Sequence, residues 1–169
     1  MDNDSIPRPF FIEFTCDHDE WPSLDEEVFD TLTQNVLKKI NWDRPFNLSV
    51  VLTNDKEIQK LNAAYLKKDA PTNVLSFASY DENLLNLLPK TEPILLGDII
   101  LSFETIKKQT IDQQKSFENH VYHLFVHGLL HLFGYDHEND VEAETMEQLE
   151  IDILATLSIP NPYEVIESI

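Results

Sequence analysis

The chain has 169 residues, the usual size of one compact domain, and we expect a single metal-binding domain over residues 1–169 with a flexible tail at about 160–169. Its formal charge of −19, from 31 acidic and 12 basic side chains, excludes a protein that binds nucleic acid through a broadly basic surface. The single cysteine cannot form an internal disulfide, and no secretion signal or membrane-spanning apolar run is present, so we expect a cytoplasmic protein.

The first two thirds of the chain are predicted to contain all the strands. Aromatic and β-branched residues predict strands, and apolar residues at three- and four-residue steps predict helices. A capping-box match from Ser23 to Glu26 predicts the start of the first helix. The expected strands are 9–16, 46–53, 74–77 and 95–103, the expected helices are about 24–40 and 55–68, and 80–94 is expected to be a surface loop or short helical turn.

The last third is predicted to be helical. One helix begins near Glu104, a second follows Ser116, and a third spans about 140–157. The three consecutive apolar residues at 99–101 predict a strand that is buried on both faces. Together the elements predict an α+β domain with a small mixed sheet of about four strands packed with about five helices, in a strand order that the sequence does not give.

Five of the six histidines lie within residues 120–137, and three of them follow the pattern H-x-x-x-H-x-x-G-x-x-H. On a helix, His127 and His131 project from one face a single turn apart. Gly134 can take a positive φ, end the helix and turn the chain back, so that His137 joins them. Three neutral imidazoles leave a fourth position for water, as in catalytic zinc sites. We therefore predict one Zn²⁺ per chain, with nickel, cobalt or copper possible at the same ligands.

The other histidines of this helix need a separate interpretation. A pair at four-residue spacing is a weak signal, because His123 also lies four residues before His127. Burying an unpaired imidazole costs about 1–3 kcal/mol, a cost that a bound metal removes. We expect His120 and His123 to be structural residues or to support the ligands, and not to bind the metal themselves.

The spacing of the three histidines also occurs in metzincin peptidases. In those enzymes a glutamate follows the first histidine and acts as the general base. This chain has Gly128 at that position, and glycine cannot transfer a proton, so peptide hydrolysis by that route is disfavoured. A metal-dependent hydrolase of some other substrate stays an alternative.

The segment HLFVHGLLHLFGYDHENDVEAETMEQLE resembles the signature of the YbeY family of metal-binding endoribonucleases, associated in bacteria with maturation of ribosomal RNA ends and ribosome quality control. The segments at 61–77 (LNAAYLKKDAPTNVLSF) and 96–102 (LGDIILS) resemble further family segments in the same order. The resemblance implies that His127, His131 and His137 are zinc ligands. It also implies an endoribonuclease of ribosomal RNA 3′-end maturation, acting on precursor RNA and not on DNA or at membranes.

One position departs from the pattern of the family, which typically has arginine where this chain has Leu66. A guanidinium can hold a phosphate through two hydrogen bonds, and leucine offers none, so we expect weaker substrate binding. Lys67 or Lys68 would supply a point charge for substrate binding, or else form an ordinary solvated pair at a helix end. The departure keeps open a second function, that of a non-catalytic ribosome assembly factor whose metal stabilises the fold.

Three further residues are candidates for proton transfer or for orienting the reacting groups. Asp136 adjoins the third histidine, Asp98 is a candidate to hold an imidazole by a hydrogen bond, and Ser76 lies in the third predicted strand. The alternatives are a strand-end role for Asp98 and a purely structural role for Ser76. Because no Lys or Arg follows Lys115, we also expect RNA binding to need ribosomal or assembly proteins that position the substrate.

Overall fold

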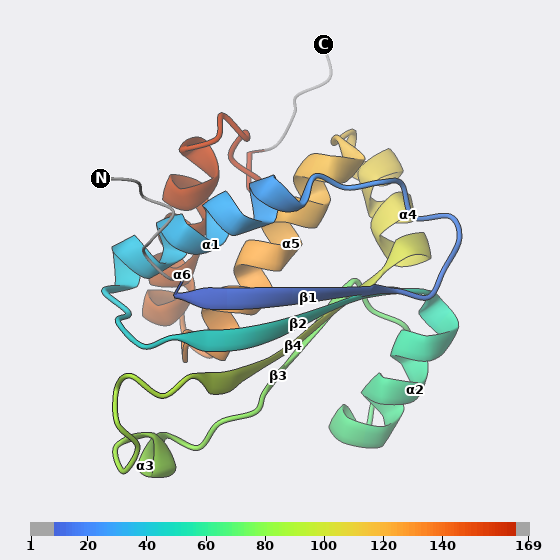
Figure 1. Cartoon of the computed structure of the whole chain (residues 1–169). Helices are drawn as coiled ribbons and strands as arrows, with labels where there is room; N and C mark the ends of the chain where they lie inside the picture. The colour runs from blue at the N-terminus through green and yellow to red at the C-terminus, as the bar shows by residue number, and fades with distance from the viewer. Residues whose placement is uncertain (1–8, 165–169) are drawn as a thin grey trace.

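The computed structural model describes residues 9–164, in which four strands form one sheet surrounded by six helices (Figure 1). The predicted α+β class and the small mixed sheet are confirmed, and the helix beyond the expected five is a single short one inside 80–94. None of the helices in the described residues is long and apolar enough to cross a membrane. The strands are β1 (Phe10–Cys16), β2 (Phe46–Thr53), β3 (Val74–Ala78) and β4 (Ile94–Ser102); the helices are α1 (Glu26–Ile40), α2 (Asp55–Leu66), α3 (Glu82–Leu85), α4 (Phe103–Gln113), α5 (Phe117–Leu132) and α6 (Asp140–Ala155).

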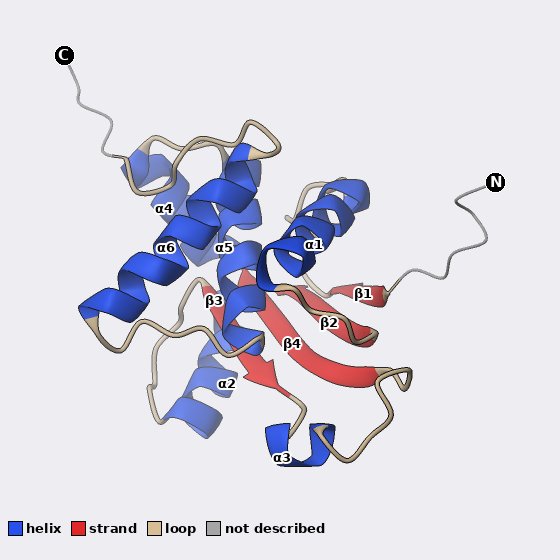
Figure 2. Cartoon of the chain, turned by 90° about the vertical axis from the view of Figure 1, so that its left-hand side faces the viewer, coloured by secondary structure: helices blue, strands red, loops and turns tan. Residues whose placement is uncertain are grey.

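The sheet has the strand order β1-β2-β4-β3. Strands β1, β2 and β4 are parallel, and β3 runs antiparallel to β4 at one edge. Helices α1, α4, α5 and α6 lie on one side of the sheet, and α2 lies on the other (Figure 1). Helix α5 is at the centre of its layer, where it contacts α1, α4, α6, β3 and β4 (Figure 2).

Burial of β4 on both faces, predicted from its apolar run, is confirmed. Ile99 and Leu101 belong to the main core, and Ile100 packs with Ile58 of α2 and Leu75 of β3 in a second cluster on the opposite face. The sheet therefore separates α2 from α5. This separation decides which of the candidate residues can approach the histidines.

Most of the predicted helix starts are confirmed by their capping side chains. Asn54 accepts a hydrogen bond from the backbone N–H of Glu57, and Ser116 accepts one from that of Asn119. The start of α1 differs from the prediction, because Asp25, and not Ser23, accepts from the N–H of Glu27. Aspartate is as good a cap as serine, so the helix begins at Glu26 instead of near 24.

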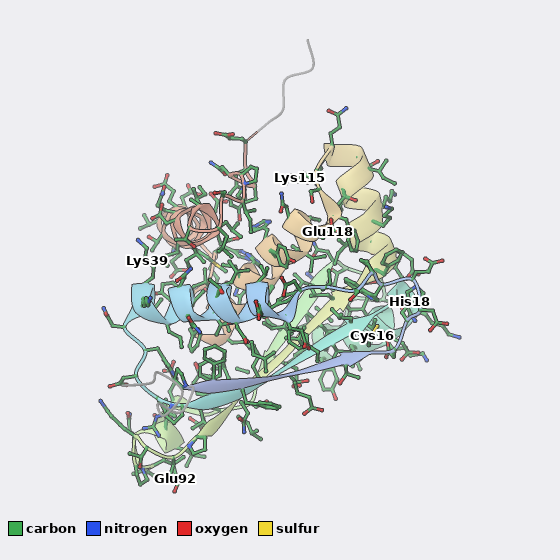
Figure 3. The ribbon with its side chains drawn as sticks, turned by 45° about the horizontal axis from the view of Figure 1, so that its top comes forward. Cys16, His18, Lys39, Glu92, Lys115 and Glu118 are labelled. Atoms are coloured by element: carbon green, nitrogen blue, oxygen red, sulfur yellow. The ribbon has the colours of Figure 1, made fainter. Side chains whose placement is uncertain are left out.

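The chain after α6 returns to α5. Lys115, at the turn between α4 and α5, donates a hydrogen bond to the carbonyl of Pro162 at 2.7 Å, and Figure 3 shows it on the side of the molecule where the described chain ends. The hydroxyl of Tyr163 donates to Glu150 of α6. Of the tail expected at 160–169, residues 160–164 thus make defined contacts, and 165–169 lie outside the described residues.

Candidate metal centre

The histidine cluster forms where α5 ends. The backbone N–H of Gly134 bonds to the carbonyl of His131, and that of Tyr135 bonds to the carbonyl of Leu130, each at 3.0 Å. These two bonds close a helix in a Schellman motif, which needs a residue of positive φ. Gly134 has φ +99°, a conformation that L side chains rarely adopt. The reversal that the sequence predicts at Gly134 is therefore confirmed, and it carries His137 back to the end of the helix.

Three imidazoles converge at this reversal. The Nε2 atoms of His127 and His131 are 3.1 Å apart, and one ring nitrogen from each of His127, His131 and His137 lies within 4.8 Å of the others. The ring of His137 lies 5.6 Å from that of His127 and 5.0 Å from that of His131, measured between centroids. His127 and His131 are partly buried and His137 is exposed, so the cluster is open to solvent on one side.

The spacing of these nitrogens fits a tetrahedral metal ion. With Zn–N bonds of about 2.0–2.1 Å, two nitrogens of one tetrahedral zinc lie about 3.3 Å apart, close to the 3.1 Å between His127 and His131. Burial, and then the neighbouring His127 and His137, lower the pKa of His131, so its ring is neutral and has a lone pair to offer. Within residues 9–164 no other group of three His, Cys, Asp or Glu side chains comes together in this way.

A buried carboxylate lies behind the cluster. Glu150 of α6 is 0% exposed, and its Oε1 lies 2.6 Å from Nε2 of His123 and 3.4 Å from Nδ1 of His127. The hydroxyl of Tyr163 donates to both of its oxygens, at 2.9 and 3.0 Å. Burial alone raises the pKa of this carboxyl, but the hydrogen bonds from His123 and His127 outweigh it and hold the pKa at about 2. Glu150 is therefore an anion inside the protein.

Glu150 is the site residue that the sequence analysis did not find. It lies four residues after Met146 and three before Ile153, both of which are buried on the inner stripe of α6. An acidic residue in the middle of an apolar stripe was the available signal, because such a residue is buried and needs partners.

Asp98, the residue proposed to hold an imidazole, lies on the other face of the sheet. A Cβ on Gly128 of α5 would be only 3.2 Å from Cγ2 of Ile99, so Ile99 faces α5. Successive residues of a strand face opposite sides, which directs Asp98 away from α5. The structure does not bring Asp98 together with the three histidines.

The close approach of Gly128 to β4 also gives this glycine a role in packing. A Cβ there would lie 3.2–3.6 Å from three atoms of the Ile99 side chain, which leaves no room for a larger side chain between α5 and β4. The position that carries a general base in metzincins is here directed at the sheet and not at the imidazoles.

Asp136 and Ser76 lie on the same side of the sheet as the histidines. The Oδ1 atom of Asp136 accepts a hydrogen bond from the backbone N–H of His137 at 2.8 Å, which ties it to the turn that carries the third histidine. Ser76 is the partner of Ile99 in the β3–β4 register, and its side chain therefore lies on the face that carries α5. Asp136 therefore lies beside the third histidine, and Ser76 lies on the face of the sheet that carries α5.

Lys67 and Lys68 lie at the end of α2, in the layer on the far side of the sheet from α5. Lys67 closes the helix with φ 57°, and the backbone N–H of Lys68 bonds to the carbonyl of Asn62. Both lysines are exposed, and Leu66 before them is 49% exposed. The chain runs from this corner directly into β3, the edge strand beside α5.

His120 and His123 have partners inside the protein. They are 5% and 8% exposed, and Nε2 of His120 lies 2.8 Å from Oε1 of Gln109, which also accepts from the amide of Asn73. An amide oxygen only accepts, so His120 carries its proton on Nε2. Burial, and then the neighbouring His123 and Lys115, lower the pKa of His120 to about 4. Its ring is therefore neutral near pH 7 and bonded to the protein.

The chain is similar to known proteins in both sequence and fold. A family model described as Endoribonuclease YbeY matches residues 13–158. Two curated relatives with that name come from Chelativorans sp., 43% identical over 96% of this chain and 99% of the relative, and Rhizobium etli, 48% identical over 90% and 92%. The solution structure of a Thermotoga maritima protein is similar in fold, with a TM-score of 0.54, 19% identity and coverage of 88% of this chain and 91% of that one.

Proposed function

The chain belongs to the endoribonuclease YbeY family, whose members hydrolyse RNA, and we propose that it is a zinc-dependent endoribonuclease of ribosomal RNA 3′-end maturation and ribosome quality control in the cytoplasm. The convergence of three imidazoles at the end of α5 is the observation that supports this proposal most strongly. A cluster that is open to solvent on one side suits a site that must admit both water and a phosphodiester.

His127, His131 and His137 are the proposed ligands. A divalent zinc ion held by these residues would supply a water of lowered pKa and a positive charge for a phosphate oxygen. His131 is neutral because burial lowers its pKa, so its ring binds a cation near pH 7 without first losing a proton. His137 comes from an exposed turn, which leaves the substrate side of the cluster accessible.

Asp136 and Ser76 are the proposed polar groups beside the reacting atoms. Asp136 holds the backbone N–H of His137, and its position on this turn suits a carboxylate that accepts a proton from the attacking water. Ser76 lies on the sheet face below α5 and is proposed to orient the phosphate or the water. Lys67 and Lys68 are proposed to attract the RNA backbone at the end of α2, on the far side of the sheet, where the chain leads into β3.

The charge of the protein bears on how it meets RNA. With a net charge of −19, the surface as a whole repels a polyanion, and the proposed metal, Lys67 and Lys68 are local positive charges. We therefore propose that a ribosomal or assembly protein presents the precursor RNA. Salt-resistant nanomolar binding of naked RNA would contradict this part of the proposal.

A second function rests on Leu66. This residue offers a half-exposed apolar side chain at the end of α2, where the family pattern has an arginine able to hold a phosphate. Weak phosphate binding is consistent with a ribosome assembly factor in which the metal stabilises the fold and RNA is not cut.

Cleavage of a ribosomal RNA precursor by zinc-loaded protein separates the two functions. We expect specific cleavage by the wild type and by a His18→Ala control, and a loss of about 100-fold or more in His131→Ala. Equal RNA patterns for wild type and His131→Ala would overturn the enzyme and favour the assembly factor. In Leu66→Arg, a restored guanidinium–phosphate contact should raise kcat/KM by about 10- to 100-fold, in line with about 1.5–3 kcal/mol for a hydrogen bond to a charged group.

A further inference from the structure

The contacts of Glu150 give this carboxylate a specific place in the site. A buried carboxylate without partners is strongly unfavourable, and Glu150 is wholly buried. Its partners are Nε2 of His123 at 2.6 Å, Nδ1 of His127 at 3.4 Å and the hydroxyl of Tyr163 at 2.9 Å. Helix α6 thus supplies one acceptor that meets two groups from α5 and one from the C-terminal segment.

The two nitrogens of the His127 ring face different neighbours. Nδ1 faces the carboxylate of Glu150, and Nε2 faces Nε2 of His131 at 3.1 Å. An ionised carboxylate only accepts hydrogen bonds, so it favours the form of His127 that carries the proton on Nδ1. That form directs the Nε2 lone pair toward His131. The other form would put a proton between the two rings and remove His127 from the set of free ligand atoms.

We propose that Glu150 is a positioning residue for the histidine cluster, which fixes the tautomer and ring orientation of His127, and that His123 and Tyr163 hold Glu150 in place. This inference rests on the proposed metal site. A carboxylate behind a metal-binding imidazole is a common arrangement in metalloproteins, where its loss weakens metal binding about 10- to 100-fold.

The same contacts separate His123 from the ligands. His123 donates from Nε2 to Glu150, so this nitrogen is not available to a metal. The ring centroids of His123 and His127 are 6.3 Å apart, against 4.6 Å for His127 and His131. His123 and His131 each lie four residues from His127, but their roles differ. His123 anchors the carboxylate of Glu150, whereas His131 directs its Nε2 atom at that of His127.

Tyr163 makes the C-terminal segment part of the site. Its hydroxyl bonds to both oxygens of Glu150, and its ring lies edge-on to the ring of His123 with centroids 5.4 Å apart. The hydrogen bond from Lys115 to the carbonyl of Pro162 holds the neighbouring backbone. Because Tyr163 is 41% exposed, it can be changed with little effect on the core.

The test measures the His127 tautomer and zinc affinity separately. Long-range ¹H–¹⁵N spectra of metal-free protein labelled at histidine show which ring nitrogen carries the proton, and competition with a chelator gives the Kd for zinc. In Glu150→Leu we expect loss of the Nδ1–H form of His127 and a 10- to 100-fold higher Kd. Glu150→Gln keeps an acceptor oxygen without the charge and should restore part of the affinity. Glu144→Gln, an exposed change on the same helix, should match the wild type.

Tyr163→Phe keeps the test decisive if Glu150→Leu does not fold. This variant removes one donor to Glu150, and we expect it to weaken zinc binding several-fold, as in Glu150→Gln. Wild-type tautomer and affinity within two-fold in every folded variant would overturn the positioning role. Zinc binding that depends on Glu150 without any RNA cleavage would contradict the proposed function alone, since the tautomer and the Kd are both measured without RNA.

Discussion

Helix α5 carries two pairs of histidines in different surroundings. His120 and His123 are buried, and each directs Nε2 at an acceptor oxygen of the protein. His127 and His131, one turn further on, are partly buried and direct their Nε2 atoms at each other. The residue type and the helix are the same in both pairs. What distinguishes a structural histidine from a candidate ligand is therefore whether a neighbouring element gives its Nε2 atom an acceptor.

Replacing one histidine of each pair in turn should give the largest difference in zinc affinity. We expect His131→Ala to weaken zinc binding by about 100-fold or more, because a three-nitrogen site loses one of its ligands. His120→Asn should keep the wild-type zinc Kd within about two-fold, since its ring nitrogen is bonded to the protein. Chelator competition on both variants measures this, and similar losses in the two would contradict the distinction.

The buried pair should make folding stability depend on pH. Burial is the largest cause that lowers the pKa of His120 from 6.5 to about 4. Between these two pH values the unfolded chain therefore binds a proton at His120 that the folded protein does not. Stability therefore falls as the pH drops below 6.5, by about 2 kcal/mol at pH 5 relative to pH 7 from this group.

Urea unfolding of wild type and His120→Asn at pH 7 and pH 5 checks this dependence. The wild type should lose about 2 kcal/mol more than the variant between the two pH values. Parallel losses would show that His120 is not held neutral by its buried position.

The turn after α5 should affect zinc binding at His127 and His131, and should not affect the buried His120 and His123. Gly134 has φ +99°, and the nearest atom to a Cβ built there is Oε1 of Glu82 at 3.9 Å, so Gly134→Ala meets backbone strain without a clash. We expect a loss of about 1–2 kcal/mol in stability and several-fold weaker zinc binding, because His137 is displaced. The pH dependence assigned to His120 should not change. Unaltered stability and zinc affinity, measured by urea unfolding and chelator competition, would contradict the role of this turn.

The elements of the fold were largely predictable, and their arrangement was not. The strand at 46–53 and the caps Asn54 and Ser116 have local causes, and the structure confirms them. The strand order depends on pairing between segments far apart in the chain, to which local patterns do not respond. The start of α1 moved because two adequate caps, Ser23 and Asp25, lie close together.

The candidate site likewise has a part that local sequence predicts and a part that depends on packing between distant segments. The histidine spacing and Gly134 lie within one helix and its turn, so the convergence of the three rings followed from the sequence. The apolar stripe of α6 indicates that Glu150 is buried, but its contacts with His123 and His127 depend on the packing of α6 on α5, which no local pattern specifies. The side of the sheet on which Asp98 lies could not be predicted from the sequence. The three residues after it are all apolar and buried, and a strand buried on both faces shows no alternation of polar and apolar residues.

X-ray absorption at the zinc edge of the metal-loaded protein is the sharpest test of a three-histidine site at the end of α5. We expect one zinc per chain with three imidazole nitrogens and one oxygen from solvent at about 2.0–2.1 Å, and two imidazoles in His131→Ala. A zinc bound by four protein atoms, or by fewer than three imidazoles in the wild type, would contradict a hydrolytic metal site at the end of α5.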